Sequence, residues 1–315
     1  MEHLDEAVVA GLLDQAEVAD TMAAVFAEWA EGSADSTVRV RAATPAGMAS
    51  AMAAVVPSLG VTGGKIYATK DGRFTFHVVL FDLDGRLLCT MDGGALTAAR
   101  TPALCAVAVR LLAPAGASVA AVLGTGLQAR PHVEMLLREL DLDELRLWGR
   151  SPTSTEELAA ESRKGAEATV TAVDRPAAAV AGADVVVTVT SSDEPLVPAE
   201  PLGAPLICAV GATKPQRREL EPDVFAGAAA IVTDSVEGAR TECGDLIGAV
   251  AAGCCSWDDV VEFRDVVAGT APVERAGGRG PVVFETQGVA IQDVATAALV
   301  WHRYLRHDSP GSNSL

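Results

Sequence analysis

The chain has 315 residues, of which 50% are hydrophobic, so it is long enough for two domains with a sizeable buried core. Its formal net charge of −18 disfavours binding to nucleic acid, because most of the surface would repel a phosphate backbone. No apolar run reaches the roughly 18 residues of a membrane helix, and the amino terminus is acidic where a secretory signal would be basic. These features predict a cytoplasmic globular protein that binds neither nucleic acid nor membrane.

The first part of the chain predicts an α+β unit. Apolar positions at helical spacing indicate a helix from Leu4 to Glu31. Short β-rich segments follow, with a hairpin turn at Asp84 and Gly85, and a helix then ends before Pro114. The predicted strands are Val38 to Ala43, Ser50 to Pro57, Gly63 to Thr69, Phe74 to Asp82 and Leu87 to Asp92, and the helix is Thr97 to Leu112.

After Pro114, strands and helices alternate, which favours a parallel sheet of the α/β, doubly wound Rossmann type. The predicted strands are Ser118 to Leu123, Glu144 to Trp148, Ala168 to Ala172, Asp184 to Thr190, Pro205 to Val210 and Ala228 to Thr233. The predicted helices between them are Gln128 to Leu140, Ser154 to Gly165 and Ala177 to Ala181. A strand from Val282 to Phe284 and a helix from Gly288 to Arg306 follow, and we expect this helix to return to the first domain.

The stretch VAAVLGTGLQA places Gly124, Gly126 and Ala129 where a strand meets a helix. In a dinucleotide site the first glycine permits the tight turn, the second lets the backbone approach a pyrophosphate, and the small third residue lets helix and strand pack. The free N–H groups of the helix terminus then bind the phosphates. The alternative is a strand-to-helix turn with no ligand.

The end of the second strand of this sheet distinguishes the two nicotinamide dinucleotides. NAD enzymes place an acidic residue there to bind the ribose hydroxyls, but LRLWGRSP contains none. Arg150 is placed to pair with a 2′-phosphate, with Ser151 and Thr153 as hydrogen-bonding neighbours, so we predict NADP(H) as the cofactor. In the alternative, Arg150 is a solvated surface residue beside a helix-capping sequence around Ser154 and Glu157.

The six cysteines lie mostly in apolar segments and form no CxxC pair. This pattern is typical of buried reduced thiols, and we predict neither a metal site nor a disulfide.

The chain resembles the ornithine cyclodeaminase and mu-crystallin family through motifs that cover most of residues 38 to 300 in order. They are VRAATP, GGKIYA, LFDLDGRLLCTMDGGALTAARTPAL, VLGTGLQARPH, LWGRS, AGADVVVTVTSSDEP, ICAVGATKPQRREL, TECGDL and GVAIQDVATAAL. The resemblance implies a homodimer in which a substrate-binding and dimerisation domain, residues 1–115 completed by 283–315, accompanies an NAD(P)-binding Rossmann domain, residues 116–282. It also implies that the substrate lies between the first domain and the nicotinamide.

Three basic residues, Arg41, Lys65 and Arg100, lie beside apolar or small residues in this acidic chain. Two guanidiniums and an ammonium in one cleft would hold an α-carboxylate and leave the lysine near the reacting carbon. The family resemblance implies the same role for these three positions, whereas each alone is also compatible with a structural ion pair. The predicted cofactor-binding residues are Gly124, Thr125, Gly126, Leu127, Gln128, Arg150, Ser151, Thr101, Thr190, Ser191, Val210 and Gly211.

The sequence departs from the cyclodeaminase pattern after the VG pair. Ornithine cyclodeaminases carry an Asp where this chain has Thr213, which cannot act as a carboxylate base. We predict that Glu242, assisted by Asp245, keeps the imine protonated, although both acids are also compatible with helix-start positions.

The predicted function is NADPH-dependent reduction of an α-imino acid, such as Δ1-pyrroline-2-carboxylate or Δ1-piperideine-2-carboxylate, to the amino acid. This activity is implied by the mu-crystallin-like branch of the family. Three alternatives stay open: an ornithine or lysine cyclodeaminase, an amino-acid dehydrogenase or reductive coupling enzyme, and a non-catalytic binder of a small ligand. Ammonia release from ornithine without added cofactor would identify the first, and the intact cationic set disfavours the last.

Overall fold

The computed structural model describes residues 2–200, 202–203 and 205–308, which form two compact units. The first comprises the residues up to Leu104 together with those from Gly288, and the second runs from Cys105 to Gln287. The sequence predicts boundaries near residues 115 and 283. The two compact units instead meet within one long helix, α3 (Gly94–Leu112), and after strand β15 (Val282–Glu285), which pairs within the second unit.

The first unit contains a largely antiparallel sheet in the order β1-β7-β6-β5-β4-β2, with β3 paired to β4. Its strands are β1 (Glu2–Leu4), β2 (Asp35–Ser36), β3 (Val40–Thr44), β4 (Gly47–Val56), β5 (Val61–Lys70), β6 (Arg73–Asp82) and β7 (Leu87–Asp92). A 3-10 turn, η1 (Pro57–Leu59), joins β4 and β5. All five predicted strands are present, and β1, which pairs parallel with β7, was not predicted.

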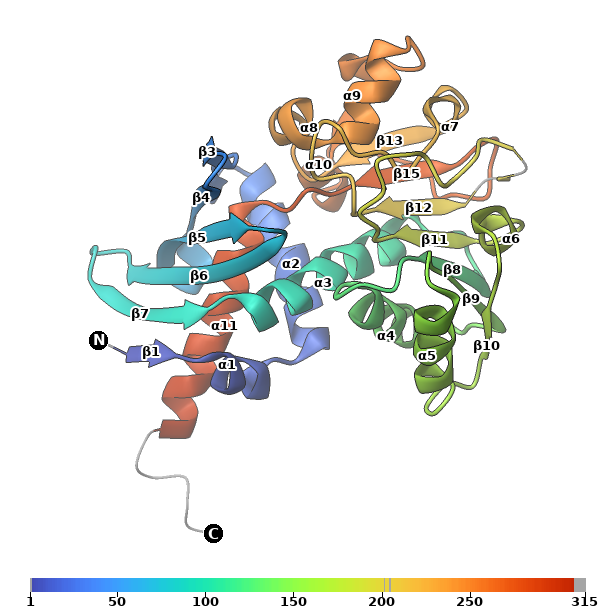
Figure 1. Ribbon diagram of the computed structural model, residues 1–315. Helices are drawn as coiled ribbons and strands as arrows, with labels where there is room; N and C mark the ends of the chain where they lie inside the picture. The colour runs from blue at the N-terminus through green and yellow to red at the C-terminus, as the bar shows by residue number, and fades with distance from the viewer. Residues whose placement is uncertain (1, 201, 204, 309–315) are drawn as a thin grey trace. The chain divides into compact units, whose positions relative to one another are not determined.

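The helices of the first unit differ from the prediction at the amino terminus. The single predicted helix is two helices, α1 (Glu6–Leu12) and α2 (Gln15–Ala30). Asp14 separates them, because its carboxylate accepts hydrogen bonds from the backbone N–H groups of Ala16 and Glu17 and begins a new helix. The carboxy-terminal helix α11 (Ala290–Asp308) packs on β4, β5 and α2, which confirms its predicted return to the first domain (Figure 1).

Helix α3 is long and apolar enough to cross a membrane by length and composition alone. Within its most hydropathic window, 72% of the residues are buried inside the protein, which is typical of the core helix of a globular protein. This apolarity therefore serves packing.

The second unit is built on an eight-stranded parallel sheet in the order β10-β9-β8-β11-β12-β15-β13-β14. Its other strands are β8 (Val119–Leu123), β9 (Glu144–Trp148), β10 (Thr169–Ala172), β11 (Val185–Thr188), β12 (Leu206–Ala209), β13 (Ala230–Thr233) and β14 (Val260–Glu262). The strand order reverses between β8 and β11, and in doubly wound sheets a ligand binds at this switch point, outside the carboxyl ends of the strands. The predicted Rossmann-type fold is confirmed.

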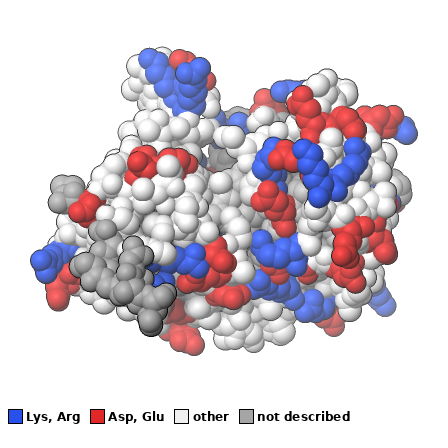
Figure 2. Space-filling model, turned by 90° about the horizontal axis from the view of Figure 1, so that it is seen from below, with Lys and Arg blue, Asp and Glu red and all other residues white. Residues whose placement is uncertain are grey.

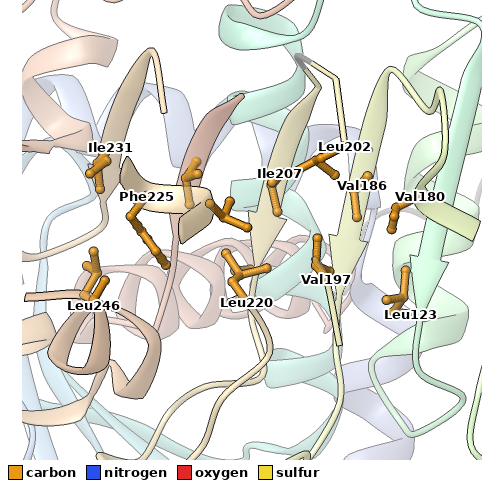
Figure 3. Packing of buried hydrophobic residues seen from close by; sticks show 14 of the residues in the cluster. Leu123, Val180, Val186, Val197, Leu202, Ile207, Leu220, Phe225, Ile231 and Leu246 are labelled. Carbon is orange, nitrogen blue, oxygen red and sulfur yellow. The ribbon is translucent and has the colours of Figure 1, made fainter. Parts of the chain in front are cut away.

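The helices of the second unit cover this sheet. They are α4 (Ala129–Glu139), α5 (Pro152–Ser162), α6 (Pro176–Val180), α7 (Pro222–Ala226), α8 (Val236–Glu242), α9 (Gly244–Ala251) and α10 (Phe263–Val267), with a 3-10 turn, η2 (Trp257–Asp259). A buried apolar cluster joins α6, α7 and α9 to the sheet through side chains such as Leu123, Val186 and Ile207 (Figure 3). This packing holds the strand ends, and the loops that follow them, in place.

The surface charge is dispersed on the face shown in Figure 2, where Lys and Arg side chains are interspersed with Asp and Glu. All six cysteines are free thiols, and four of them are buried. Burial raises the pKa of the Cys89 thiol to about 12, so this thiol is protonated and chemically quiet at neutral pH.

Candidate active site

Lys65 is a buried cation in β5 of the first unit, with only 2% of its surface exposed. Its Nζ atom donates a hydrogen bond to Oδ1 of Asp293 at 2.8 Å and another to Oγ1 of Thr97 at 2.6 Å. The ammonium also lies 4.4 Å from the centre of the Phe76 ring, close enough for a cation–π contact. The lysine is therefore held at a defined position by charge, hydrogen bonding and an aromatic face.

Arg100 in α3 joins the same cluster. Its Nη1 donates to Oε1 of Gln292 at 2.7 Å, and its Nε lies 3.5 Å from Oδ1 of Asp293. Gly288 permits this approach, since a Cβ atom there would lie 2.6 Å from Nη1 of Arg100, and its φ of +82° favours glycine. The start of α11 thus brings Gln292 and Asp293 against Lys65 and Arg100, two of the three predicted carboxylate ligands.

The charged groups in this cluster shift one another's pKa values. Burial, opposed by the Asp293 carboxylate and aided by the Arg100 charge, lowers the pKa of Lys65 to about 8. Burial alone would raise the pKa of Asp293, but the Lys65 and Arg100 charges outweigh it and the pKa is lowered. Near neutral pH the two cations exceed the one carboxylate, so the cluster can accept a further anionic group.

Arg41, the third predicted ligand, lies in β3 opposite Ser50 and is exposed. Arg39, two residues earlier, is half-buried and donates from Nη2 to the Gly288 carbonyl at 2.9 Å. The Arg39 charge also lowers the pKa of Lys65 and of Asp293. The structure therefore adds Arg39 to the cluster, and the role of Arg41 as a carboxylate ligand stays a prediction.

Three members of this cluster were not predicted from the sequence as site residues: Arg39, Gln292 and Asp293. Asp293 is fully buried, and GVAIQDVATAAL was recognised only as a family motif on a terminal helix. An acid in the first turn of an apolar helix was the available signal, because a buried carboxylate requires a cationic partner. Thr101, a predicted cofactor-binding residue, is buried and donates its hydroxyl to the Thr97 carbonyl at 2.7 Å.

The glycine-rich loop of the second unit has the geometry of a phosphate cradle. Gly124 has a φ of +126°, and a Cβ atom there would lie 2.7 Å from the Val189 carbonyl oxygen. A Cβ on Gly126 would meet no atom within 4 Å, so the backbone there borders open space. Ala129 begins α4 and is fully buried, as close helix–strand packing requires. These residues fit a dinucleotide pyrophosphate, and Thr125, Leu127 and Gln128 complete the loop before α4.

The predicted 2′-phosphate site adjoins this loop. A Cβ atom on Gly149 would lie 2.6 Å from the Thr125 side chain, so the residues after β9 pack directly against the glycine-rich loop. Arg150 is exposed, and no described residue forms a hydrogen bond or ion pair with it. Ser151 is the N-cap of α5 and accepts a hydrogen bond from the Ser154 N–H, so the helix begins at Pro152, two residues before the predicted start at Ser154.

The residues predicted on the nicotinamide side follow two neighbouring strands. Thr190 and Ser191 come after β11, and Val210 and Gly211 come after β12, which pairs with β11 in parallel. Their carboxyl ends share one edge of the sheet, the edge at which such folds bind their ligands. Thr213 lies in the same loop, and its N–H donates to the Gly211 carbonyl at 2.8 Å.

The two predicted acids occupy the junction of α8 and α9. Glu242 is buried at the end of α8, and Asp245 lies in the first turn of α9. Oδ1 of Asp245 accepts backbone hydrogen bonds from Glu219 at 2.8 Å and Leu220 at 3.1 Å. Asp245 thus binds the backbone of the chain segment before α7. The catalytic role of Glu242 stays a prediction.

The comparisons with known proteins identify the family. Residues 3–308 match the model of the ornithine cyclodeaminase/mu-crystallin family. The mouse ketimine reductase mu-crystallin is 37% identical over 227 residues, which cover 71% of this chain and 68% of that protein.

A probable ornithine cyclodeaminase from Bordetella pertussis superposes with a TM-score of 0.91 at 32% identity, over 98% of each chain. The iminosuccinate reductase of Paracoccus denitrificans in complex with NAD⁺ superposes with a TM-score of 0.88 at 30% identity, over 98% of this chain and 97% of that one. The resemblance found in the sequence motifs is thereby confirmed, and the chain belongs to the ornithine cyclodeaminase/mu-crystallin family.

Proposed function

We propose that this protein is an NADPH-dependent reductase that converts an α-imino acid, such as Δ1-pyrroline-2-carboxylate or Δ1-piperideine-2-carboxylate, to the amino acid. It is an NAD(P)H-dependent oxidoreductase that acts on C=N bonds of small molecules. The observation that carries the proposal is the buried cluster of Lys65, Arg100 and Asp293, whose excess positive charge suits a substrate carboxylate. The names of the mouse and Paracoccus relatives, a ketimine reductase and an iminosuccinate reductase, support the same reaction class.

Reduction of a C=N bond adds a hydride to carbon and a proton to nitrogen. NADPH supplies the hydride from C4 when bound. The Arg100 guanidinium, together with Arg41, holds the substrate carboxylate and so fixes the orientation of the imine. Lys65, whose pKa of about 8 lies near neutral pH, holds the proton that the reacting nitrogen takes up.

A screen of purified protein against cyclic and acyclic imino acids tests this function. We expect NADPH oxidation with at least one α-imino acid and formation of the corresponding amino acid in equal amount. Ammonia release from ornithine or lysine without added cofactor, with no NADPH oxidation by any imino acid, would instead identify a cyclodeaminase. Because Thr213 stands where a cyclodeaminase has Asp, we expect the first result.

The preference for NADPH depends on Arg150, which is exposed beside the glycine-rich loop. Arg150→Ala removes a charge-assisted contact with the 2′-phosphate, so we expect the Kd for NADPH to rise roughly tenfold or more while that for NADH hardly changes. Arg175→Ala, which removes an exposed arginine after the neighbouring strand β10, serves as the matched control and leaves both values unchanged. An equal loss of affinity for NADPH and NADH in Arg150→Ala would contradict the assignment of Arg150 to the 2′-phosphate. A preference for NADH in the unaltered protein would also contradict it.

We also propose that the protein is a homodimer joined through its first unit. Val55 and Ile66 are 42% and 53% exposed on the face of β4 and β5 that points away from the buried Met52 and Tyr67. A homodimer, which the family resemblance implies, would cover these two side chains. Sedimentation is expected to give close to twice the 32.3 kDa chain mass, and Val55→Asp is expected to lower it. A monomer at micromolar concentration in the unaltered protein would contradict the dimer.

We place the enzyme in the cytoplasm. Its six cysteines are free thiols, which persist in a reducing compartment. The NADPH that we propose as its cofactor would have to be exchanged from a soluble pool.

A further inference from the structure

Glu219 is a fully buried carboxylate that lies in the second unit and accepts four hydrogen bonds. Its Oε1 accepts from the Thr190 N–H and the Thr190 hydroxyl, both at 2.6 Å. Its Oε2 accepts from the Thr188 hydroxyl at 2.8 Å and from the Gly211 N–H at 2.7 Å. No lysine, arginine or histidine of the described residues pairs with this carboxylate, so its interactions are with the last residue of β11 and with the loops that follow β11 and β12.

The segment that carries Glu219 is itself firmly held. Asp245 accepts the backbone N–H groups of Glu219 and Leu220, as described above. The Glu219 carbonyl accepts hydrogen bonds from the N–H groups of Leu196 at 2.7 Å and Val197 at 2.9 Å. The Leu220 side chain points into the apolar cluster beside Val197 (Figure 3). The carboxylate is therefore presented from a rigid support.

The two carboxylate oxygens of Glu219 link the loop after β11 to the loop after β12, because each oxygen accepts a backbone N–H from one of them. A Cβ atom on Gly211 would lie 2.2 Å from the Thr190 carbonyl oxygen and 2.5 Å from Oε1 of Glu219, so the loops are as close as glycine permits. The segment before Thr190 also supports the phosphate cradle, since Val189 packs against Gly124. Any displacement of Thr190 or Gly211 would change the edge of the sheet at which the cofactor binds.

We propose that Glu219 is a positioning residue that fixes the loops after β11 and β12 in the conformation that receives the nicotinamide end of the cofactor. The inference rests on the proposed function for the identity of that ligand. An amide cannot replace the carboxylate, because the backbone N–H groups of Thr190 and Gly211 need one acceptor on each side-chain oxygen. In Glu219→Gln the –NH₂ group faces one of these two N–H groups, which must then move away.

The test compares two ligands that share the adenosine end of the cofactor. NADPH carries the nicotinamide, whereas 2′,5′-ADP carries only the adenosine with its 2′- and 5′-phosphates. For Glu219→Gln we expect the Kd for NADPH to rise about tenfold or more, with a lower kcat, while the Kd for 2′,5′-ADP stays within about twofold of the unaltered protein. If Glu219 has a purely structural role, the substitution would raise the Kd for both ligands together, and that result would overturn the proposal. An unchanged Kd for NADPH would also overturn it.

Two further variants keep the test decisive. Glu262→Gln removes a carboxylate that accepts the Val236 N–H at 3.1 Å at the end of the edge strand β14, and it is expected to change neither affinity. Thr188→Val removes one of the four donors with little change in side-chain volume. We expect it to weaken the binding of NADPH, but not that of 2′,5′-ADP, by a smaller factor than Glu219→Gln does. Thr188→Ser, which keeps the hydroxyl, is expected to bind NADPH as the unaltered protein does. If the unaltered protein binds NADPH but reduces no imino acid, the proposed function fails while these binding measurements still decide the role of Glu219.

Discussion

Replacement of Lys65 by Ala is expected to lower kcat and raise KM for the imino acid, with kcat/KM falling by roughly 100- to 10,000-fold, the usual contribution of a positioned proton donor. Lys65 is held 2.8 Å from Asp293 and 2.6 Å from Thr97, so its proton is delivered from a fixed position. An interaction that strengthens in the transition state affects the chemical step, and its loss lowers kcat as well as weakening substrate binding. Steady-state kinetics with saturating NADPH measures both effects.

Lys65→Met separates the lost charge from the lost packing. Methionine fills much of the volume of the lysine stem, and Asp293 keeps a cationic neighbour because Nε of Arg100 lies 3.5 Å from it. We therefore expect Lys65→Met to fold, to bind NADPH normally, and to lose as much kcat as Lys65→Ala. A variant with normal kcat and a raised KM alone would show that Lys65 only binds the substrate.

Replacement of Asp293 by Asn is expected to shift the pH dependence of kcat/KM. The protonated form of Lys65 is the active one in this mechanism, so kcat/KM falls as pH rises through its pKa of about 8. Asp293 is the anion that keeps this pKa from falling further under burial and the Arg100 charge. Without it the pKa of Lys65 drops, and the descending limb of the profile moves to lower pH, with the largest loss of activity above neutral pH.

The same substitution leaves two buried cations without their carboxylate. Removing one partner of a buried pair costs about 3 to 5 kcal/mol of stability, and deprotonation of Lys65 reduces that loss. The urea midpoint of Asp293→Asn should therefore rise with pH across the range in which Lys65 loses its proton in the folded protein but keeps it when unfolded. An unchanged pH profile together with an unchanged midpoint would show that Asp293 does not control Lys65.

The clustering of Lys65 and Arg100 could be anticipated from the sequence, because cations inside apolar segments of an acidic chain require a specific explanation. Asp293 could not be placed from local pattern, since the strand that carries Lys65 and the helix that carries Asp293 lie 228 residues apart and meet only after folding. The choice between Arg39 and Arg41 likewise depends on side-chain reach. They are two positions apart in the chain, and only the structure shows Arg39 donating to the Gly288 carbonyl.

The parallel sheet was predictable for a related reason. Strands such as β8, β11 and β12 are continuous apolar runs, which buried parallel strands favour, so their positions were found to within a few residues. The segments α7, α8, α10 and β14 have only three to seven residues, too few to show a period. Glu219 was missed because its partners are backbone N–H groups and hydroxyls of two distant loops, which leave no pattern in the sequence.

The proposed function requires hydride transfer from NADPH to the imine carbon of an α-imino acid. It is tested most directly by supplying the purified enzyme with NADPH deuterated at C4 on the transferred face, together with Δ1-piperideine-2-carboxylate or Δ1-pyrroline-2-carboxylate, and locating the label in the product. We expect one deuterium at the α carbon of the amino acid for each NADPH oxidised, and loss of this transfer in Lys65→Met. Ammonia release from ornithine or lysine without added cofactor, and no transfer of label to any imino acid, would contradict it.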